Sequence, residues 1–123
     1  MAYKPTDSEL EILNILWKKE VATVREVHEQ IAKKKDTGYT TTLKIMQIMH
    51  GKKLLNRKEH GRGHIYMPAI SEKEVQNSLL NNFTAMAFGG SAKKLIMRAL
   101  GQSNPSKEEI KEIRELLKKL ENQ

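Results

Sequence analysis

Four polar side chains in residues 39–55, YTTTLKIMQIMHGKKLL, have the types and the spacing that could read DNA bases. They are Thr40, Thr41, Lys44 and Gln47, which would share one side of a helix with no acid among them. Gln can form two hydrogen bonds with adenine, Lys can donate to guanine, and the Thr methyl can contact the thymine methyl. The segment therefore predicts a helix that lies in the DNA major groove. An ordinary amphipathic helix with a solvated polar side is the alternative that these residues leave open.

The elements that would hold this helix precede it in the chain. Its other side carries apolar residues at helical spacing, namely Leu43, Ile45, Met46 and Met49. Upstream, a Thr followed three residues later by Glu occurs twice and fits the capping-box pattern that marks a helix start. The two pairs are Thr6 with Glu9 and Thr23 with Glu26. Each start is followed by apolar residues at helical spacing: Leu10, Ile12, Leu13, Leu16 and Trp17, then Val24, Val27 and Ile31.

A basic β-hairpin is predicted after the third helix. Residues 54–59 and 64–68 read as two short strands, and the turn between them contains two glycines. Three basic residues are predicted at or near its tip: Arg57, Lys58 and Arg62. Two helices, a base-reading helix and a basic hairpin, in this order, predict a winged helix-turn-helix whose hairpin follows the DNA backbone.

Positive charge is concentrated where this fold would contact phosphates. Residues 1–38 hold seven basic and seven acidic residues, residues 39–70 hold six and one, and residues 71–123 hold nine and seven, for a net charge of +7. Such a local excess is typical of a surface that neutralises phosphates, and it adds Lys52 and Lys53 to the predicted backbone contacts. A basic membrane-binding surface usually exposes aromatic or large apolar residues, and aromatic residues make up 5% here.

The composition argues against several other classes. Cysteine is absent, which excludes disulfides and thiolate metal sites and fits a reducing compartment. No carboxylate cluster accompanies the histidines, so we predict no metal site, no cofactor and no enzyme activity. The histidines are His28, His50, His60 and His64. No apolar run approaches a membrane span, and the N-terminal residues lack the layout of a signal peptide. We therefore expect a cytoplasmic protein with no membrane binding of its own.

Residues 71–123 predict an α-helical dimerisation domain that follows a winged-helix domain formed by residues 1–70. Two further capping boxes and a Gly-Gly break mark three short helices, and Gly101 is predicted to end the second. These helices have little to form a core of their own, which favours a homodimer over a cap folded back on the same chain. The residues predicted to pack against the second copy are Val75, Leu79, Phe83, Leu95, Ile96, Ile110, Ile113, Leu117 and Leu120.

Four segments resemble the penicillinase-repressor (BlaI/MecI) family, which also includes CopY-type copper repressors: TDSELEILNILW, TVREVHEQI, YTTTLKIMQIMHGKKLL and HIYMP. The resemblance is strongest over residues 6–68, and AFGGSAKKLIMRALG with the charged helix after it is similar to the family's dimerisation region. It implies a homodimeric winged-helix transcriptional repressor on a palindromic operator in double-stranded DNA, often of TACA/TGTA type. It implies base-reading roles for Thr40, Thr41, Lys44 and Gln47, and wing roles for Arg62 and His64.

The chain departs from the family pattern at several places. Family members often have Arg where this chain has Ile48 and Gly where it has Lys53. Some members are inactivated by a metalloprotease that cuts an Asn-Phe bond; the matching place here is Arg98-Ala99, and Asn82-Phe83 lies earlier. Regulation by cleavage therefore does not carry over with the resemblance, nor does metal sensing through C-terminal cysteines. The family's membrane sensor or protease, commonly encoded nearby, is the further partner that the resemblance implies.

Two other function classes stay open at the level of sequence. A winged-helix adaptor that binds another protein would show weak, salt-insensitive DNA binding. A small-ligand-responsive regulator would need a pocket between the N-terminal domain and the helices of residues 71–123, and no polar cluster in the sequence defines one.

Overall fold

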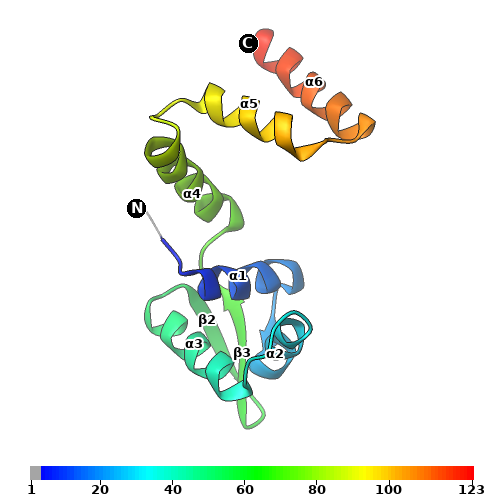
Figure 1. The fold of residues 1–123 in the computed structure, drawn as a ribbon. Helices are drawn as coiled ribbons and strands as arrows, with labels where there is room; N and C mark the ends of the chain where they lie inside the picture. The colour runs from blue at the N-terminus through cyan, green and yellow to red at the C-terminus, as the bar shows by residue number, and fades with distance from the viewer. Residues whose placement is uncertain (1–3) are drawn as a thin grey trace. The chain divides into compact units, whose positions relative to one another are not determined.

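The helix starts follow the capping sequences. In the computed structural model, which describes residues 4–123, Thr6, Thr23 and Ser106 each form a complete capping box with a Glu three residues later. These caps begin α1 (Asp7–Lys19), α2 (Val24–Ala32) and α6 (Lys107–Glu121). The other elements are β1 (Ala22–Thr23), α3 (Tyr39–Gly51), β2 (Leu55–His60), β3 (Gly63–Pro68), α4 (Glu72–Ala87) and α5 (Ala92–Ser103) (Figure 1).

One apolar core joins α1, α2, α3 and the sheet. Its fully buried side chains come from every one of these elements and include Ile12, Leu13, Leu16, Val27, Met46, Met49, Leu55 and Tyr66. Burying an apolar side chain of this size contributes about 2 kcal/mol relative to exposure. The predicted core positions Leu10 and Trp17 are only partly buried and pack at its edge.

The hairpin belongs to a three-stranded antiparallel sheet with the order β1-β3-β2. β2 and β3 pair from Leu55 opposite Pro68 to His60 opposite Gly63, which confirms the predicted hairpin. β1 was not predicted, because a strand of two residues shows no alternation that a sequence pattern could reveal. The fold is mainly α with this small sheet, as expected.

Trp17 ties α1 to the segment that follows the hairpin. Its indole Nε1 donates a hydrogen bond to the carbonyl oxygen of Ile70 at 3.0 Å. The N–H of Ala69 donates to the carbonyl oxygen of Leu54 at 2.9 Å, so both ends of the hairpin are held close together. The base of the hairpin is therefore anchored to the helices.

The chain divides into two compact units between Leu80 and Asn81, within α4. From the sequence, this boundary was predicted after residue 70. The first part of α4 belongs to the N-terminal unit because Val75 is fully buried there and Leu79 packs against the same core. Val75 has no exposed surface that could contact a second copy, so its assignment to the dimerisation residues was wrong. Leu79 is partly buried, so only part of its side chain could contact a second copy.

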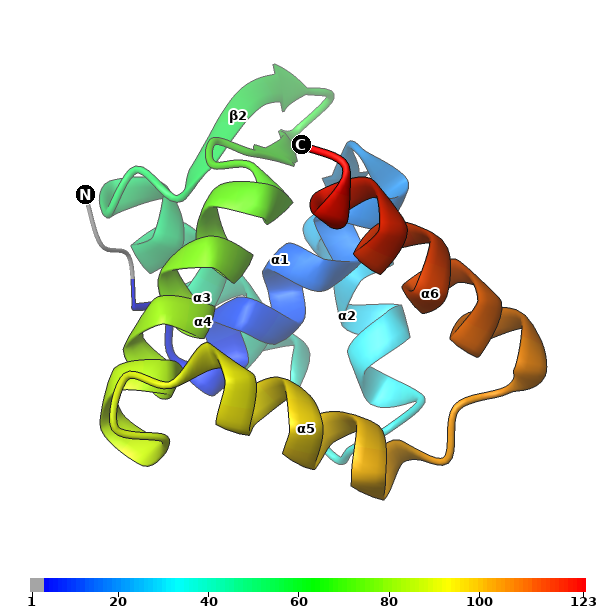
Figure 2. The same ribbon diagram turned by 90° about the horizontal axis from the view of Figure 1, so that it is seen from above.

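The C-terminal unit contains the end of α4 together with α5 and α6, whose ribbons are seen from above in Figure 2. Both α5 and α6 are fully described and contain no buried residue. α5 continues through Gly101 to Ser103, so the prediction that Gly101 ends this helix was wrong. Asn104 instead takes the left-handed conformation at φ 52° that ends a helix, and Pro105 follows it.

Glu9 is a buried carboxylate that joins α1 to the end of α3. Its Oε1 accepts a hydrogen bond from the Thr6 N–H at 3.0 Å, and its Oε2 accepts one from Lys52 Nζ at 2.7 Å. Burial by itself raises the pKa of this carboxyl, but the bonds from Lys52 and Thr6 outweigh burial and hold the pKa of Glu9 below its ordinary value. The fold therefore favours the ionised form.

We expect Glu9→Gln to lower the free energy of unfolding by about 1 kcal/mol near neutral pH, because Gln keeps the capping bond and loses the ion pair. Since folding lowers the pKa of Glu9, its carboxylate stabilises the fold above the ordinary value of 4.5. That contribution is lost as the pH falls through the lower, folded pKa. Urea unfolding between about pH 7 and about pH 3 measures it. The gap between wild type and variant should narrow on acidification; a gap that stays constant would contradict this account.

Candidate nucleic-acid interface

α3 has one side in the core and one side open. Thr42, Met46 and Met49 are buried, with 0–1% of their surfaces exposed. The exposed residues include all four that were predicted to read bases: Thr40, Thr41, Lys44 and Gln47. The structure thus brings these four side chains together on the open side of one helix, and their role in reading bases stays a prediction.

The start of α3 is fixed by side chains that were not among the predicted site residues. His28 of α2 shares a hydrogen bond of 3.0 Å between its Nδ1 and Thr42 Oγ1. The His28 ring also meets the Tyr39 ring edge to face, with centroids 5.8 Å apart. The guanidinium carbon Cζ of Arg25 lies over the Tyr39 ring, 5.5 Å from its centre. No sequence motif signals such contacts, because they join α2 to α3 across the turn.

The end of α3 is set by backbone hydrogen bonds. Lys53 has a left-handed φ of 66°. Its N–H donates to the His50 carbonyl at 3.1 Å, and the Leu54 N–H donates to the Met49 carbonyl at 2.9 Å. This pair of bonds is the Schellman motif, in which glycine is the usual left-handed residue. The predicted backbone contact Lys52 has its ammonium engaged with Glu9, whereas Lys53 forms no ion pair within residues 4–123.

Arg62 lies in the two-residue turn at the tip of the hairpin, beside Gly61 at φ 59°. Arg57 and Lys58 were predicted at or near this tip, and that placement was wrong. They pair with Tyr66 and Ile65, which also pair with β1, so they lie in the body of the sheet.

The register also separates the wing residues by face. Cross-strand partners point to the same face of a sheet, and Arg57 is opposite Tyr66, whose side chain is buried against the helices. Arg57 and His64 therefore share the helix-facing side, where the His64 and Tyr66 rings lie 6.2 Å apart. Lys58 alternates to the opposite face of the sheet from Arg57.

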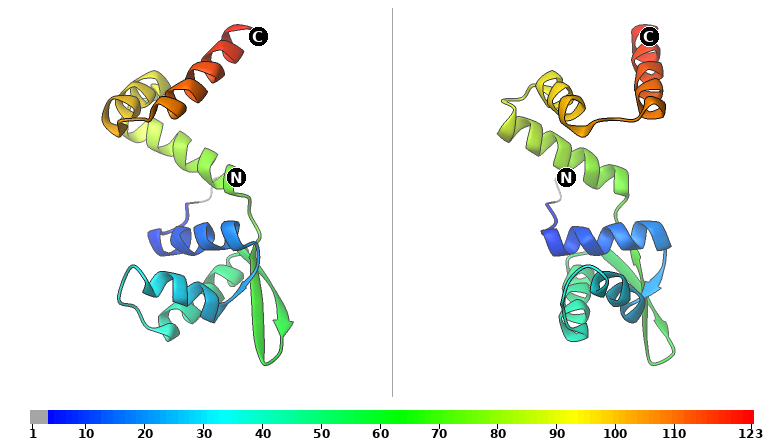
Figure 3. Two further views of the ribbon diagram at one scale, coloured as in Figure 1. Left: turned by 90° about the vertical axis from the view of Figure 1, so that its right-hand side faces the viewer. Right: turned by 45° about the vertical axis from the view of Figure 1, so that its right-hand side comes forward.

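Within the N-terminal unit, α3 and the hairpin tip lie on the side away from α1. The views in Figure 1 and in both panels of Figure 3 agree on this arrangement. A helix with exposed polar side chains therefore lies in the same unit as a projecting basic turn, which is how a winged helix-turn-helix meets DNA.

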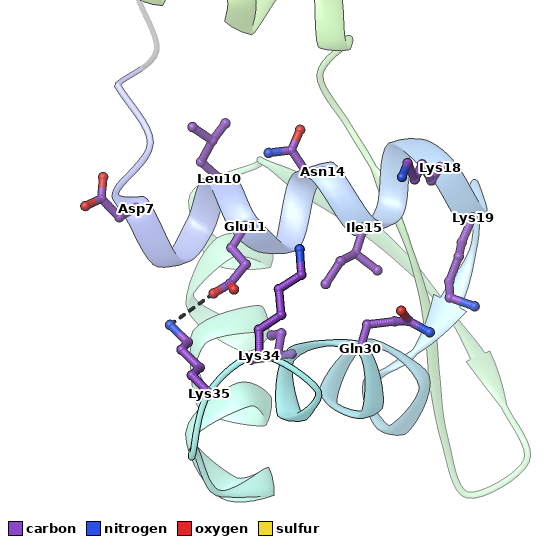
Figure 4. A pocket seen from close by; sticks show the side chains of 11 residues that line it. Asp7, Leu10, Glu11, Asn14, Ile15, Lys18, Lys19, Gln30, Lys34 and Lys35 are labelled. Atoms are coloured by element: carbon purple, nitrogen blue, oxygen red, sulfur yellow. Dashed lines mark ion pairs between the residues drawn. The ribbon is translucent and has the colours of Figure 1, made fainter.

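A groove of 610 Å³ lies elsewhere on this unit, between α1 and α2. Leu10, Ile15 and Ile31 supply apolar surface, and Lys18, Lys19, Lys34 and Lys35 are among its polar lining. Lys35 reaches back to Glu11, with 3.0 Å between Nζ and Oε1 (Figure 4).

The described residues 4–123 contain no group of three His, Asp or Glu side chains placed to hold a metal. In the same range, no helix has both the length and the apolar character needed to cross a membrane.

Most of the residues predicted to form a dimer are exposed or partly exposed in the single chain. Exposed fractions are 51% for Phe83, 53% for Ile96 and 55% for Leu117. Ile110 and Leu120 are also exposed, and Leu95 and Ile113 are partly buried. The structure thus leaves an apolar surface on the C-terminal unit that nothing within that unit covers.

We expect Lys53→Gly to raise the free energy of unfolding by about 1 kcal/mol, because glycine adopts the left-handed conformation without the clash of a Cβ atom. Lys53→Ala is the matched control, since it removes the same charge and keeps the Cβ. Urea unfolding of the two variants measures the difference. Equal stability of the two variants would show that the backbone at this position is not strained.

Comparison with known proteins agrees with this geometry. The penicillinase repressor family model matches residues 5–119. The methicillin resistance regulatory protein MecI of Staphylococcus aureus is 25% identical over 117 residues, which cover 95% of each chain. The solution structure of the DNA binding domain of the repressor BlaI covers 60% of this chain and 93% of that one, at a TM-score of 0.52 and 28% identity.

A second solved structure shows a related unit on DNA. It is the solution structure of Bacillus licheniformis BlaI in its monomeric form, in complex with the blaP half-operator. It covers 60% of this chain and 90% of that one, with a TM-score of 0.52 and 26% identity. Since the family model spans nearly the whole sequence and the fold matches as well, the chain belongs to the penicillinase repressor family.

Proposed function

We propose that this protein, a DNA-binding transcriptional repressor of the penicillinase repressor family, acts as a homodimer on a palindromic operator. The observation that carries the proposal is the open, acid-free side of α3, held outward by Thr42, Met46 and Met49 in the core. The solved complex of BlaI with a half-operator supports it, because a half-operator is what one winged-helix unit of a twofold dimer would occupy. The family is one of repressors and not of enzymes.

In this proposal α3 enters the major groove and the hairpin follows the backbone. Lys44 and Gln47 donate to base edges, and Thr40 and Thr41 add methyl and hydroxyl contacts. Arg62 at the turn binds phosphate, and Arg57 and His64 lie on the face of the sheet that is turned toward the helices. Lys53 adds a charge at the end of α3, and the proposed role of Lys52 is limited by its ion pair with Glu9.

The C-terminal unit supplies the proposed dimer surface. α6 has apolar residues along one side and charged residues along the other, and none of its residues is buried. Contact with the same surface of a second copy would remove this apolar area from water, and a twofold arrangement matches a palindrome. The proposed surface includes Phe83, Leu95, Ile96, Ile110, Ile113, Leu117 and Leu120, with Leu79 at its edge.

The signal that relieves repression is proposed to act through a membrane sensor or protease encoded nearby. The Asn82-Phe83 bond lies inside α4, and the Arg98-Ala99 bond lies inside α5. A protease needs an extended segment of chain, so either helix would have to unwind before its bond could be cut. Helical structure at both places supports a mode of release other than direct cleavage of these bonds.

Lys44→Ala and Gln47→Ala should each cost about 1–3 kcal/mol of operator binding and reduce discrimination against altered sequences. Arg62→Ala should instead weaken all duplexes alike and reduce the slope of log affinity against log salt by about one. Titrations of operator and scrambled duplex at several salt concentrations measure both effects. Equal, salt-insensitive binding of the two duplexes by the wild type would favour an adaptor that binds protein.

Dimerisation is tested with a pair of double variants that leave net charge unchanged. Leu117→Gln with Leu120→Gln should convert the protein to monomer at micromolar concentration, because it removes two apolar side chains from the proposed surface. The matched control is Glu115→Gln with Lys118→Gln on the charged side of α6, which should remain dimeric. Sedimentation equilibrium measures the mass. A monomeric wild type, or a dimeric Leu117/Leu120 variant, would overturn the proposed interface.

A further inference from the structure

Arg25 is an exposed cation placed next to the first residue of α3. It is the second residue of α2, and its Cζ lies 5.5 Å from the centre of the Tyr39 ring. Tyr39 begins α3 and is itself 40% exposed. A guanidinium at this distance from an aromatic ring is attracted to it, and the contact restricts where the side chain points. α2 and α3 lie side by side here, as Figure 3 shows.

The ring that supports Arg25 is held by the core. Tyr39 contacts the His28 ring edge to face at 5.8 Å, and His28 shares a 3.0 Å hydrogen bond with Thr42. Thr42 is buried beneath the open side of α3, with 1% exposed. A continuous set of contacts therefore runs from the buried side of α3 to the guanidinium of Arg25, so its position is linked to that of α3.

Within the part of the chain that the structure describes, no acid forms an ion pair with Arg25. The ion pairs within residues 4–123 join Lys35 to Glu11 and Lys52 to Glu9. The adjacent acid, Glu26, has its carboxylate Oε1 accepting from the Thr23 N–H at 2.9 Å in the capping box. The guanidinium thus keeps its donors available to a ligand.

The position of Arg25 does not serve the stability of α2. A cation in the first turn of a helix lies near the positive end of the helix dipole, which is unfavourable by a few tenths of a kcal/mol. An exposed Arg at such a position, supported by an aromatic ring, is better explained by binding an anion than by folding.

We propose that Arg25 binds a DNA phosphate beside the bases that α3 contacts, and that Tyr39 is the positioning residue for it. This inference rests on the proposed placement of α3 in the major groove. The first helix of a helix-turn-helix crosses the sugar-phosphate backbone, so α2 is the element that would meet it. The guanidinium can form two parallel hydrogen bonds with phosphate oxygens, which lysine cannot.

The test measures affinity against salt for the full chain on operator and on scrambled duplex. Arg25→Ala should weaken both duplexes by about tenfold and reduce the salt slope by about one. Arg25→Lys should keep the slope and lose part of the affinity, because lysine keeps the charge without the paired donors. Lys18→Ala on α1 removes the same charge from the groove between α1 and α2 and should change neither quantity.

The role of Tyr39 is tested by a cycle of variants. Tyr39→Phe keeps the ring and should bind as wild type does. Tyr39→Ala should weaken binding by less than Arg25→Ala, and the double variant should bind no worse than Arg25→Ala alone. Additive losses would assign Tyr39 a separate contact and would overturn its positioning role.

An unchanged salt slope for Arg25→Ala, with unfolding as in wild type, would overturn the phosphate contact. A loss confined to the operator would also overturn it, because it would mean base reading. Since the slope is measured on scrambled duplex as well, the result for Arg25 is obtained even where Lys44 and Gln47 prove not to discriminate sequence. Failure of this inference and failure of the proposed function are therefore distinguishable.

Discussion

The burial of one side of α3 is the constraint on which the N-terminal unit depends. Met46 and Met49 fill space between α1, α2 and the sheet, so the rotation of α3 about its axis is fixed by packing. Any other rotation would expose these methionines and place Lys44 or Gln47 in an apolar core, at a cost of several kcal/mol. The polar side chains thus point outward because of what lies beneath them. Capping at the start of α1 and the Schellman motif after α3 hold the ends of the same assembly.

Much of this arrangement could be predicted from the sequence, because it follows from local rules. Capping boxes predicted the starts of α1 and α2, helical spacing predicted the buried and open sides of α3, and glycines predicted the hairpin turn. What could not be predicted depends on contacts between distant residues. β1 forms because β3 lies beside it. Lys52 is paired with Glu9, which is 43 residues away in the chain but close in space. The guanidinium of Arg25 is held in place by the Tyr39 ring, which comes from another helix.

The two units differ in how much of their apolar surface is buried within the unit. The N-terminal unit has a closed core that extends into the first turns of α4, where Val75 is fully buried. In the C-terminal unit, α5 and α6 are amphipathic helices without a buried residue. The domain boundary predicted from the sequence lies too early in the chain. The apolar pattern of α4 is the same along its whole length, so it does not show that the first part of this helix packs within the N-terminal unit. Periodicity shows that a helix has an apolar side and does not show which partner covers it.

Trp17, whose indole N–H donates to the Ile70 carbonyl, makes the N-terminal unit optically distinct because it lies in that unit. The chain has one tryptophan, so its intrinsic indole emission reports on that unit and not on α5 or α6. Far-ultraviolet circular dichroism reports on the helices of both units. Any difference between the two signals on denaturation would separate the opening of the winged helix from the loss of the helices that follow it, without an added label.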